Sequence, residues 1–133
     1  MTGERETGMK DAARIAPWLS VADATRAVGF YAAAFGAVEV ERLEDAPGRV
    51  AVAELSIGDA TFWVQQDEAS SPDALGGRSS VRMVLIVDDP DRFFARAVGA
   101  GATVVTAVHD GHGWRVGRLA DPAGHQWEIG RRT

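Results

Sequence analysis

The chain of 133 residues contains no cysteine, which excludes disulfide bonds, thiolate metal sites and cysteine nucleophiles. It also has no excess of positive charge, because 14 lysine and arginine residues stand against 19 aspartate and glutamate residues, a formal net charge of −5. Without a positive field we expect no nucleic-acid partner. The acidity either favours a cationic ligand mildly or only keeps the protein in solution.

Long hydrophobic runs are absent as well, and none approaches the roughly 18 apolar residues that a membrane helix needs. The first residues, MTGERETGMKDAAR, are charged and lack the apolar region of a secretory signal. We therefore predict a cytoplasmic protein with no membrane partner, in which residues 1–13 form a polar tail. The hydrophobic residues, 46% of the chain, are sufficient for one small domain or two halves with a shared core.

Two segments of the chain follow the same plan. In the first, an apolar run ends at Val21, Asp23 stands at a helix N-cap, and apolar residues follow at helical spacing. In the second, the run ends at Val87, Asp89 takes the cap, and Pro90 occupies the first helical position. Both pairs are 66 residues apart (87 − 21 and 89 − 23). The offset indicates that one structural unit is used twice.

After each predicted helix the apolar residues alternate with a period of two, which predicts strands. In the first half the strands are joined by turns at residues 47–48 and 58–59; in the second they are joined by the loop HDGHG (109–113) and the turn DPAG (121–124). Each half therefore reads β-α-β-β-β. Since one helix covers only one face of a sheet, we expect the halves to pair their other faces, within one chain or between two chains.

The domain organisation follows from this repeat. We predict a first module at residues 14–66, a linker loop at 67–80 and a second module at 81–130. The linker, DEASSPDALGGRSS, is rich in Ser, Asp, Gly and Pro. A connection of this length is a solvated linker, a lid over a site, or a hinge through which two protomers exchange modules.

Two βαβββ modules, the opening WLSVADATRAVGFYAAAFGA and the ending GRLADPAGHQWEI resemble the vicinal oxygen chelate superfamily, which includes glyoxalase I, extradiol dioxygenases, fosfomycin-resistance enzymes and bleomycin-resistance proteins. IAPWLSV and WRVGRLADPAGHQWEI are similar to its glyoxalase/bleomycin-resistance or PhnB-like branch. The resemblance covers about residues 14–130. It implies an α+β fold whose modules form a cup-shaped, mostly antiparallel sheet.

The resemblance also implies a divalent metal in the cup, held by a residue on the first and on the last strand of each module. The corresponding positions in this chain are Ala16, Phe62 or the adjacent Trp63, Arg82 and Glu128. Of these positions only Glu128 has a side chain that can bind a metal ion, and the permanent positive charge of Arg82 repels a cation. We therefore predict no metal and no other cofactor, and expect a pocket in which Arg82 lies near Glu128.

Strand parity predicts which other side chains face this pocket. The predicted ligand-binding residues are Trp18, Ser20, Phe62, Val64, Arg82, Val84, Trp114 and Glu128, with Gln66 and Ile86 continuing the same faces. This set is apolar and aromatic with few polar groups, as in small-molecule pockets. Trp63 and Trp127 are expected to pack on the helices, and His109 and His112 to be solvated loop residues. His125 is expected to face outward or to pack near the module helix.

Two functions remain open beside a purely structural or regulatory role. The first is a metal-free binding protein of the bleomycin-resistance type, which sequesters an aromatic or cationic small molecule between aromatic rings and so confers drug resistance. The second is a glyoxalase-like lyase or isomerase in which Glu128 is a metal ligand or a general base. The missing metal ligands favour binding, and we expect a homodimer with the site at or near its interface.

Overall fold

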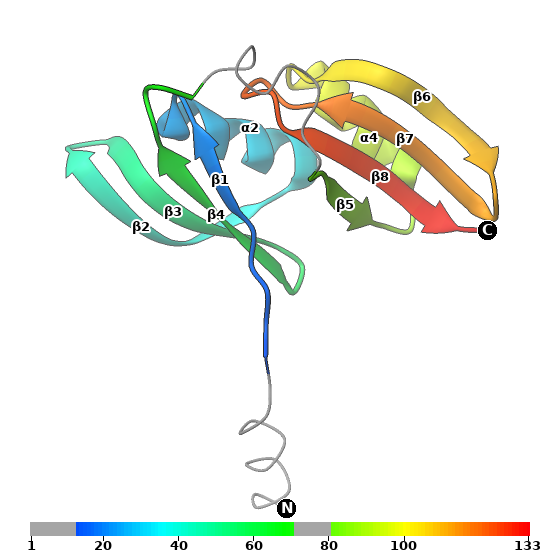
Figure 1. Cartoon of the computed structure of the whole chain (residues 1–133), viewed down its shortest axis with the longest axis horizontal. Helices are drawn as coiled ribbons and strands as arrows, with labels where there is room; N and C mark the ends of the chain where they lie inside the picture. Colours follow the sequence, from blue (N-terminus) through cyan, green and yellow to red (C-terminus); the bar gives the residue numbers. More distant parts are fainter. Residues whose placement is uncertain (1–12, 71–80) are drawn as a thin grey trace, which may run out of the picture.

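The computed structural model describes residues 13–70 and 81–133, which form two modules with the same order of elements (Figure 1). The predicted β-α-β-β-β plan is confirmed. Residues 1–12 of the predicted tail and 71–80 of the predicted linker lie outside the described residues. The first module consists of β1 (Trp18–Val21), α2 (Ala24–Phe35), β2 (Val38–Ala46), β3 (Arg49–Ile57) and β4 (Ala60–Gln66), and the second of β5 (Met83–Ile86), α4 (Pro90–Gly99), β6 (Thr103–Gly111), β7 (Trp114–Ala120) and β8 (Gln126–Arg132).

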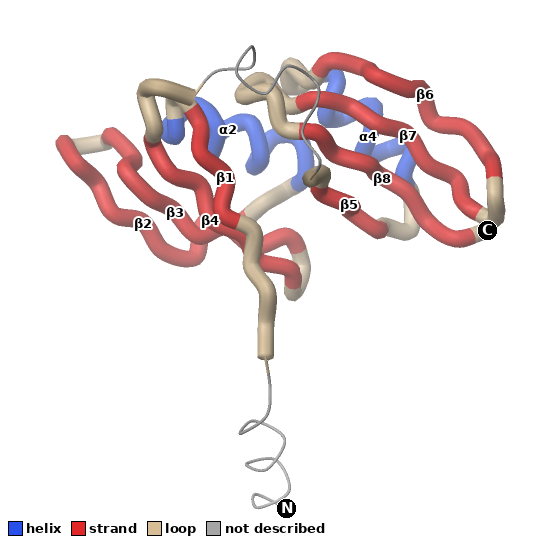
Figure 2. Tube along the Cα trace, in the orientation of Figure 1, coloured by secondary structure: helices blue, strands red, loops and turns tan. Residues whose placement is uncertain are grey.

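Each module forms one four-stranded sheet, with strand orders β1-β4-β3-β2 and β5-β8-β7-β6. The pairs β1–β4 and β5–β8 are parallel, and the other neighbours are antiparallel. The sheets lie side by side, with both helices behind them in the view of Figure 2. Since β1 and β5 are edge strands, the described strands form two separate sheets rather than one continuous cup. We call the face of each sheet that no helix covers its open face.

Both helices begin where the sequence predicts. The Asp23 carboxylate accepts a hydrogen bond from the backbone N–H of Arg26 (3.0 Å), and Asp89 accepts one from Arg92 (3.2 Å). Helix α2 ends at Phe35 and is followed by the C-cap Gly36, whose φ of 68° is the left-handed conformation that glycine adopts without strain. No helix among the residues described is long and apolar enough to cross a membrane.

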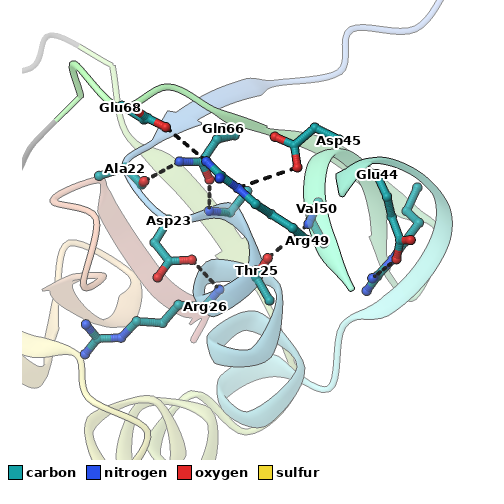
Figure 3. A network of polar contacts seen from close by, with 12 residues as sticks. Ala22, Asp23, Thr25, Arg26, Glu44, Asp45, Arg49, Val50, Gln66 and Glu68 are labelled. Atoms are coloured by element: carbon teal, nitrogen blue, oxygen red, sulfur yellow. Dashed lines mark hydrogen bonds and ion pairs between the residues drawn. The ribbon is translucent and has the colours of Figure 1, made fainter. Parts of the chain in front are cut away.

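The N-terminus of α2 is also fixed by the sheet (Figure 3). The Gln66 side chain at the end of β4 accepts from the N–H of Ala24 (2.8 Å) and donates to the carbonyl of Ala22 (2.6 Å). Thr25 Oγ1 accepts from the backbone N–H of Val50 on β3 (3.0 Å). Gln66 therefore caps the helix, and the prediction that it faces the pocket is wrong.

The two modules share one aromatic core. The ring of Trp127 on β8 lies against three rings of the first module, with centroid distances of 5.5 Å to Tyr31, 4.8 Å to Phe35 and 5.6 Å to Phe62. Trp127 is 2% exposed, which confirms that it packs in the core. The two helices are also joined directly, because Arg96 Nε of α4 donates a hydrogen bond to the carbonyl of Ala33 on α2 (2.8 Å). Burial of these rings gives the halves a common interior.

A buried carboxylate, Asp121 of the DPAG turn, lies at the edge of this core and is 4% exposed. Its Oδ1 accepts from the backbone N–H groups of Ala123 (3.0 Å) and His125 (2.9 Å), which shapes the turn. Its Oδ2 accepts from Trp127 Nε1 (2.9 Å) and from the hydroxyl of Tyr31 in the other module. Four donors thus satisfy the buried charge, and one of them joins the modules.

This bond makes stability depend on alkaline pH. Burial, and then the negative charge of Asp121, raise the pKa of the Tyr31 hydroxyl well above its ordinary value of 10.0. The unfolded chain therefore loses this proton before the folded chain does. Stability is complete below about pH 10 and falls above it, by about 1.4 kcal/mol per pH unit from this group. Tyr31 is the only tyrosine of the chain, so tyrosinate absorbance reports on it alone.

We expect tyrosinate absorbance to appear only together with loss of the folded far-ultraviolet dichroism. In Tyr31→Phe, the free energy of unfolding, measured with urea between pH 9 and pH 11, should lose the part of its slope that comes from this proton. Tyrosinate formed near pH 10 in a chain that keeps its dichroism would contradict the buried contact.

Candidate functional site

Two tryptophans form an aromatic platform on the open face of the first sheet. The rings of Trp18 on β1 and Trp63 on β4 are stacked, with centroids 5.9 Å apart and planes at 24°. Trp18 Nε1 donates to Gln65 Oε1 (2.9 Å), which fixes the ring, and Ser20 Oγ lies 3.5 Å from the same oxygen. Trp18 remains 53% exposed. The platform offers flat apolar surface, and its side chains lose little conformational freedom when a ligand binds because they are already held in place.

The structure corrects the residues predicted for β4. Phe62 and Val64 are 3% and 0% exposed and lie on the helix side of the sheet, where Phe62 meets the ring of Tyr31. The neighbouring Trp63 faces the open side, although it was expected to pack on a helix. Val64 is therefore a core residue, whereas Phe62 packs in the core and also lines, with Arg82 and Val84, a hollow of about 590 Å³ between the modules. Trp63 joins the residues of the open face.

The strand register explains this error of one residue. On β1 and β4 the partners are Trp18 and Trp63; on β5 and β8 the equivalent partners are Val84 and Glu128. The offset between modules is thus 66 residues on the first strand (84 − 18) but 65 on the last (128 − 63). The residue of the first module that matches Glu128 is Trp63, since a shift of one residue turns a side chain to the other face.

An arginine cluster lies on the open face of the second sheet: Arg82, Glu128 and Arg118. The predicted proximity of Arg82 and Glu128 is confirmed, because Arg82 Nε pairs with Glu128 Oε2. Arg118 Nη2 reaches the same oxygen from β7, at 3.2 Å. Sequence reasoning missed Arg118, although the hairpin around the DPAG turn places it directly opposite Glu128 in the register.

Other predicted site residues lie beside this cluster. A hollow of about 250 Å³ on the second sheet is lined by Val84, His109, Gly111, His112, Trp114, Val116, Glu128 and Gly130. The Arg132 guanidinium lies 4.8 Å from the centre of the Trp114 ring, a cation–π contact at one end of the hollow. Trp18 and Ser20 therefore lie on one open face, and Arg82, Val84, Trp114 and Glu128 on the other, while Phe62 meets Arg82 and Val84 only in the hollow between the modules.

The histidines differ in part from expectation. His109 and His112 are exposed, as predicted, but β6 continues through His109 to Gly111, so that only His112 and Gly113 form the turn, both at positive φ. His125 makes a contact between modules, since its Nε2 lies 2.9 Å from the carbonyl oxygen of Ser20 on β1. It is half-buried, so it is not turned outward.

The donor set does not fit a divalent metal ion. The positions that correspond to the ligands implied by the resemblance carry Ala16, Trp63, Arg82 and Glu128, which supply one carboxylate. That carboxylate already accepts from two guanidinium groups. In the parts of the chain that are described, no three His, Asp or Glu side chains gather as a metal site requires.

Two βαβββ modules, each with a helix on one face of its sheet and an open face on the other, define a protein of the vicinal oxygen chelate class. The family model of the glyoxalase-like domain matches residues 17–130, so the chain belongs to the glyoxalase-like family. Uncharacterized proteins of Mycobacterium tuberculosis (Rv0887c) and Mycobacterium bovis (Mb0911c) are each 41% identical to it over 125 residues. These alignments cover 88% of this chain and 73% and 82% of the respective relatives.

Solved structures support the same fold. TioX from Micromonospora sp. ML1 is 27% identical, with a TM-score of 0.73, and the match covers 92% of this chain and 100% of TioX. The fosfomycin resistance protein FosX from Listeria monocytogenes has a TM-score of 0.71 at 15% identity, with 92% of this chain and 94% of FosX covered. The likeness to FosX concerns the fold alone.

The two faces of β4 give a test by substitution. Phe62→Ala should lower the free energy of unfolding by about 3–5 kcal/mol, because it leaves a cavity beneath α2. Trp63→Ala loses only a partly exposed ring and its stacking with Trp18, and should cost less than about 1.5 kcal/mol. Urea unfolding followed by far-ultraviolet dichroism measures both values. The reverse order would place Trp63 in the core and contradict the assignment of the open face.

Proposed function

We propose that this chain is a metal-free small-molecule-binding protein of the bleomycin-resistance type, which sequesters an aromatic compound and so acts in drug resistance in the cytoplasm. The observation that carries the proposal is the composition of the family's metal position. Trp63 and Arg82 stand where ligands would be, and the carboxylate of Glu128 is bound by Arg82 and Arg118. A site of this kind binds by stacking and ion pairing instead of by coordination.

The aromatic platform supports an aromatic ligand. Trp18 and Trp63 are stacked on each other and held by Gln65, so a flat ligand meets rings that are already ordered. Glu54 on β3 lies next to Trp63 in the register and would suit a cationic group on such a ligand. The cationic ligand that the net charge suggested therefore stays an alternative.

The catalytic alternative has less support. A general base needs a carboxylate free to accept a proton from its substrate. Two guanidinium groups already bind the same oxygen of Glu128, so this carboxylate is engaged in ion pairs instead of being free to accept a proton from a substrate. The site thus suits a lyase or isomerase less well than it suits binding.

A second copy of the chain is the proposed cover of the open faces. Within the described residues the helices cover only the other faces, and Trp18, Val84 and Ile86 are 53%, 57% and 63% exposed. Glu41 and Glu54 lie opposite each other on the first open face, while arginine predominates on the second, so the two faces have opposite charge. A homodimer that pairs the first sheet of one chain with the second sheet of its partner buries both.

Sedimentation or light scattering at micromolar concentration should therefore give the mass of two chains. Val84→Glu, which places a charge on the exposed apolar part of the second open face, should shift the mass toward one chain. The matched change Val98→Glu on the exposed side of α4 should not. A single-chain mass for the unsubstituted protein would contradict the dimer.

Binding is tested by calorimetric titration with naphthamide, a flat and neutral aromatic amide, in the presence of EDTA. We expect measurable affinity without metal, and a loss of about tenfold or more in Trp18→Leu, since stacking on the platform contributes of the order of 1 kcal/mol or more. Phe93→Leu on α4 is the matched control, in which the affinity should not change.

The result that contradicts the proposal is binding that EDTA abolishes and that nickel, zinc or manganese restores. Equal affinity in Trp18→Leu and the unsubstituted protein would show that the platform does not hold the ligand.

A further inference from the structure

We infer that the arginine cluster of Arg82, Glu128 and Arg118 binds an oxyanion of the ligand, such as a carboxylate. The ligand class is then an aromatic acid, with a flat apolar body and one anionic group. The inference rests on the proposed binding function and adds the charge of the ligand. It also assigns a role to the position at which the family resemblance implies a metal ion.

The first observation is the ratio of charges. In the other ion-pair groups of the described residues, one arginine contacts two carboxylates: Arg42 contacts Glu39 and Glu44, Arg49 contacts Asp45 and Glu68, and Arg115 contacts Asp91 and Asp110. In the arginine cluster the ratio is reversed, since two guanidinium groups share one oxygen of Glu128. The cluster therefore has a formal surplus of one positive charge in a chain whose net charge is −5.

The second observation is that this charge is accessible and already ordered. The side chains of Arg82 and Arg118 are 49% and 35% exposed, while that of Glu128 is 22% exposed. Glu128 holds both guanidinium groups at one place on the open face. A planar guanidinium presents several N–H donors and matches the two oxygens of a carboxylate, so a second acceptor bound there forms charge-assisted hydrogen bonds.

In the proposed homodimer the first sheet of one chain, with its aromatic platform, lies against the second sheet of its partner, so the platform and the cluster would hold the two ends of one ligand. The surface around the cluster is apolar as well. Val84 pairs with Glu128 in the register, and both Val84 and Ile86 expose more than half of their surface beside the cluster. Trp114, with the Arg132 guanidinium on its ring, lines the hollow that includes Glu128. The additional positive charge of Arg132 repels a cation from this face and attracts an anion.

Three probes with the same aromatic body test whether the site prefers an anionic, a neutral or a cationic ligand. They are naphthoate, naphthamide and naphthylmethylammonium, respectively. Each is titrated calorimetrically into the full chain at low and at high salt. We expect naphthoate to bind about tenfold or more tightly than naphthamide, with the ammonium weakest, and the difference to shrink as salt rises.

Substitution then locates the anion. Arg118→Gln and Arg82→Gln should each reduce the naphthoate affinity to near that of naphthamide and leave the naphthamide affinity unchanged. Arg49→Gln, an exposed ion-paired arginine elsewhere in the first module, is the control and should keep the preference. Circular dichroism of each variant confirms that it is folded.

The outcomes are distinct. If no probe binds, the proposed function itself fails. If naphthamide or the ammonium binds as tightly as naphthoate, binding stands and the anion site is overturned. The same holds if Arg118→Gln lowers the mass from two chains to one while the preference for naphthoate persists, since the surplus charge then serves only the partner's carboxylates.

Discussion

The carboxylate of Asp121 is the constraint on which the rest of the structure depends. A charge that is 4% exposed is tolerable only when hydrogen bonds replace water, and four donors do so here. Two backbone donors set the turn before β8, and Trp127 and Tyr31 supply the others. Because Tyr31 belongs to the first module, the geometry of one turn fixes how the two halves meet.

That junction decides which faces of the two sheets stay open. The two modules contact each other through the helix-covered sides of their sheets, where Trp127 packs against Tyr31, Phe35 and Phe62. The opposite faces therefore stay open. The aromatic platform lies on one open face and the arginine cluster on the other. The same register that sends Trp127 into the shared core turns Glu128 toward the open side. The core and the candidate site are thus two sides of the same strand.

The repeat, the helix caps and the proximity of Arg82 to Glu128 were predictable from the sequence, because local patterns and a constant offset determine them. Which side chains of β4 face the open side of the sheet was not predictable. The offset drops by one residue between first and last strands, and Phe62 and Trp63 are both aromatic, so hydrophobic pattern alone does not choose between them. Arg118 and the buried role of Asp121 depend on partners that are distant or lie across a hairpin, which only the folded register reveals.

The most direct test of this account is the stability of Asp121→Asn, measured by urea unfolding near neutral pH with dichroism and tryptophan fluorescence. The asparagine side chain would keep one acceptor oxygen and place an NH2 donor where the second carboxylate oxygen now accepts hydrogen bonds. We therefore expect the free energy of unfolding to fall by about 2–4 kcal/mol. The unfolding transitions followed by dichroism and by fluorescence, which should coincide in the unsubstituted chain, should then separate because the hydrogen bond between the modules is weakened. Asp59→Asn in an exposed turn should change stability by less than about 0.5 kcal/mol. Asp121→Asn with unchanged stability and coincident transitions would contradict the account.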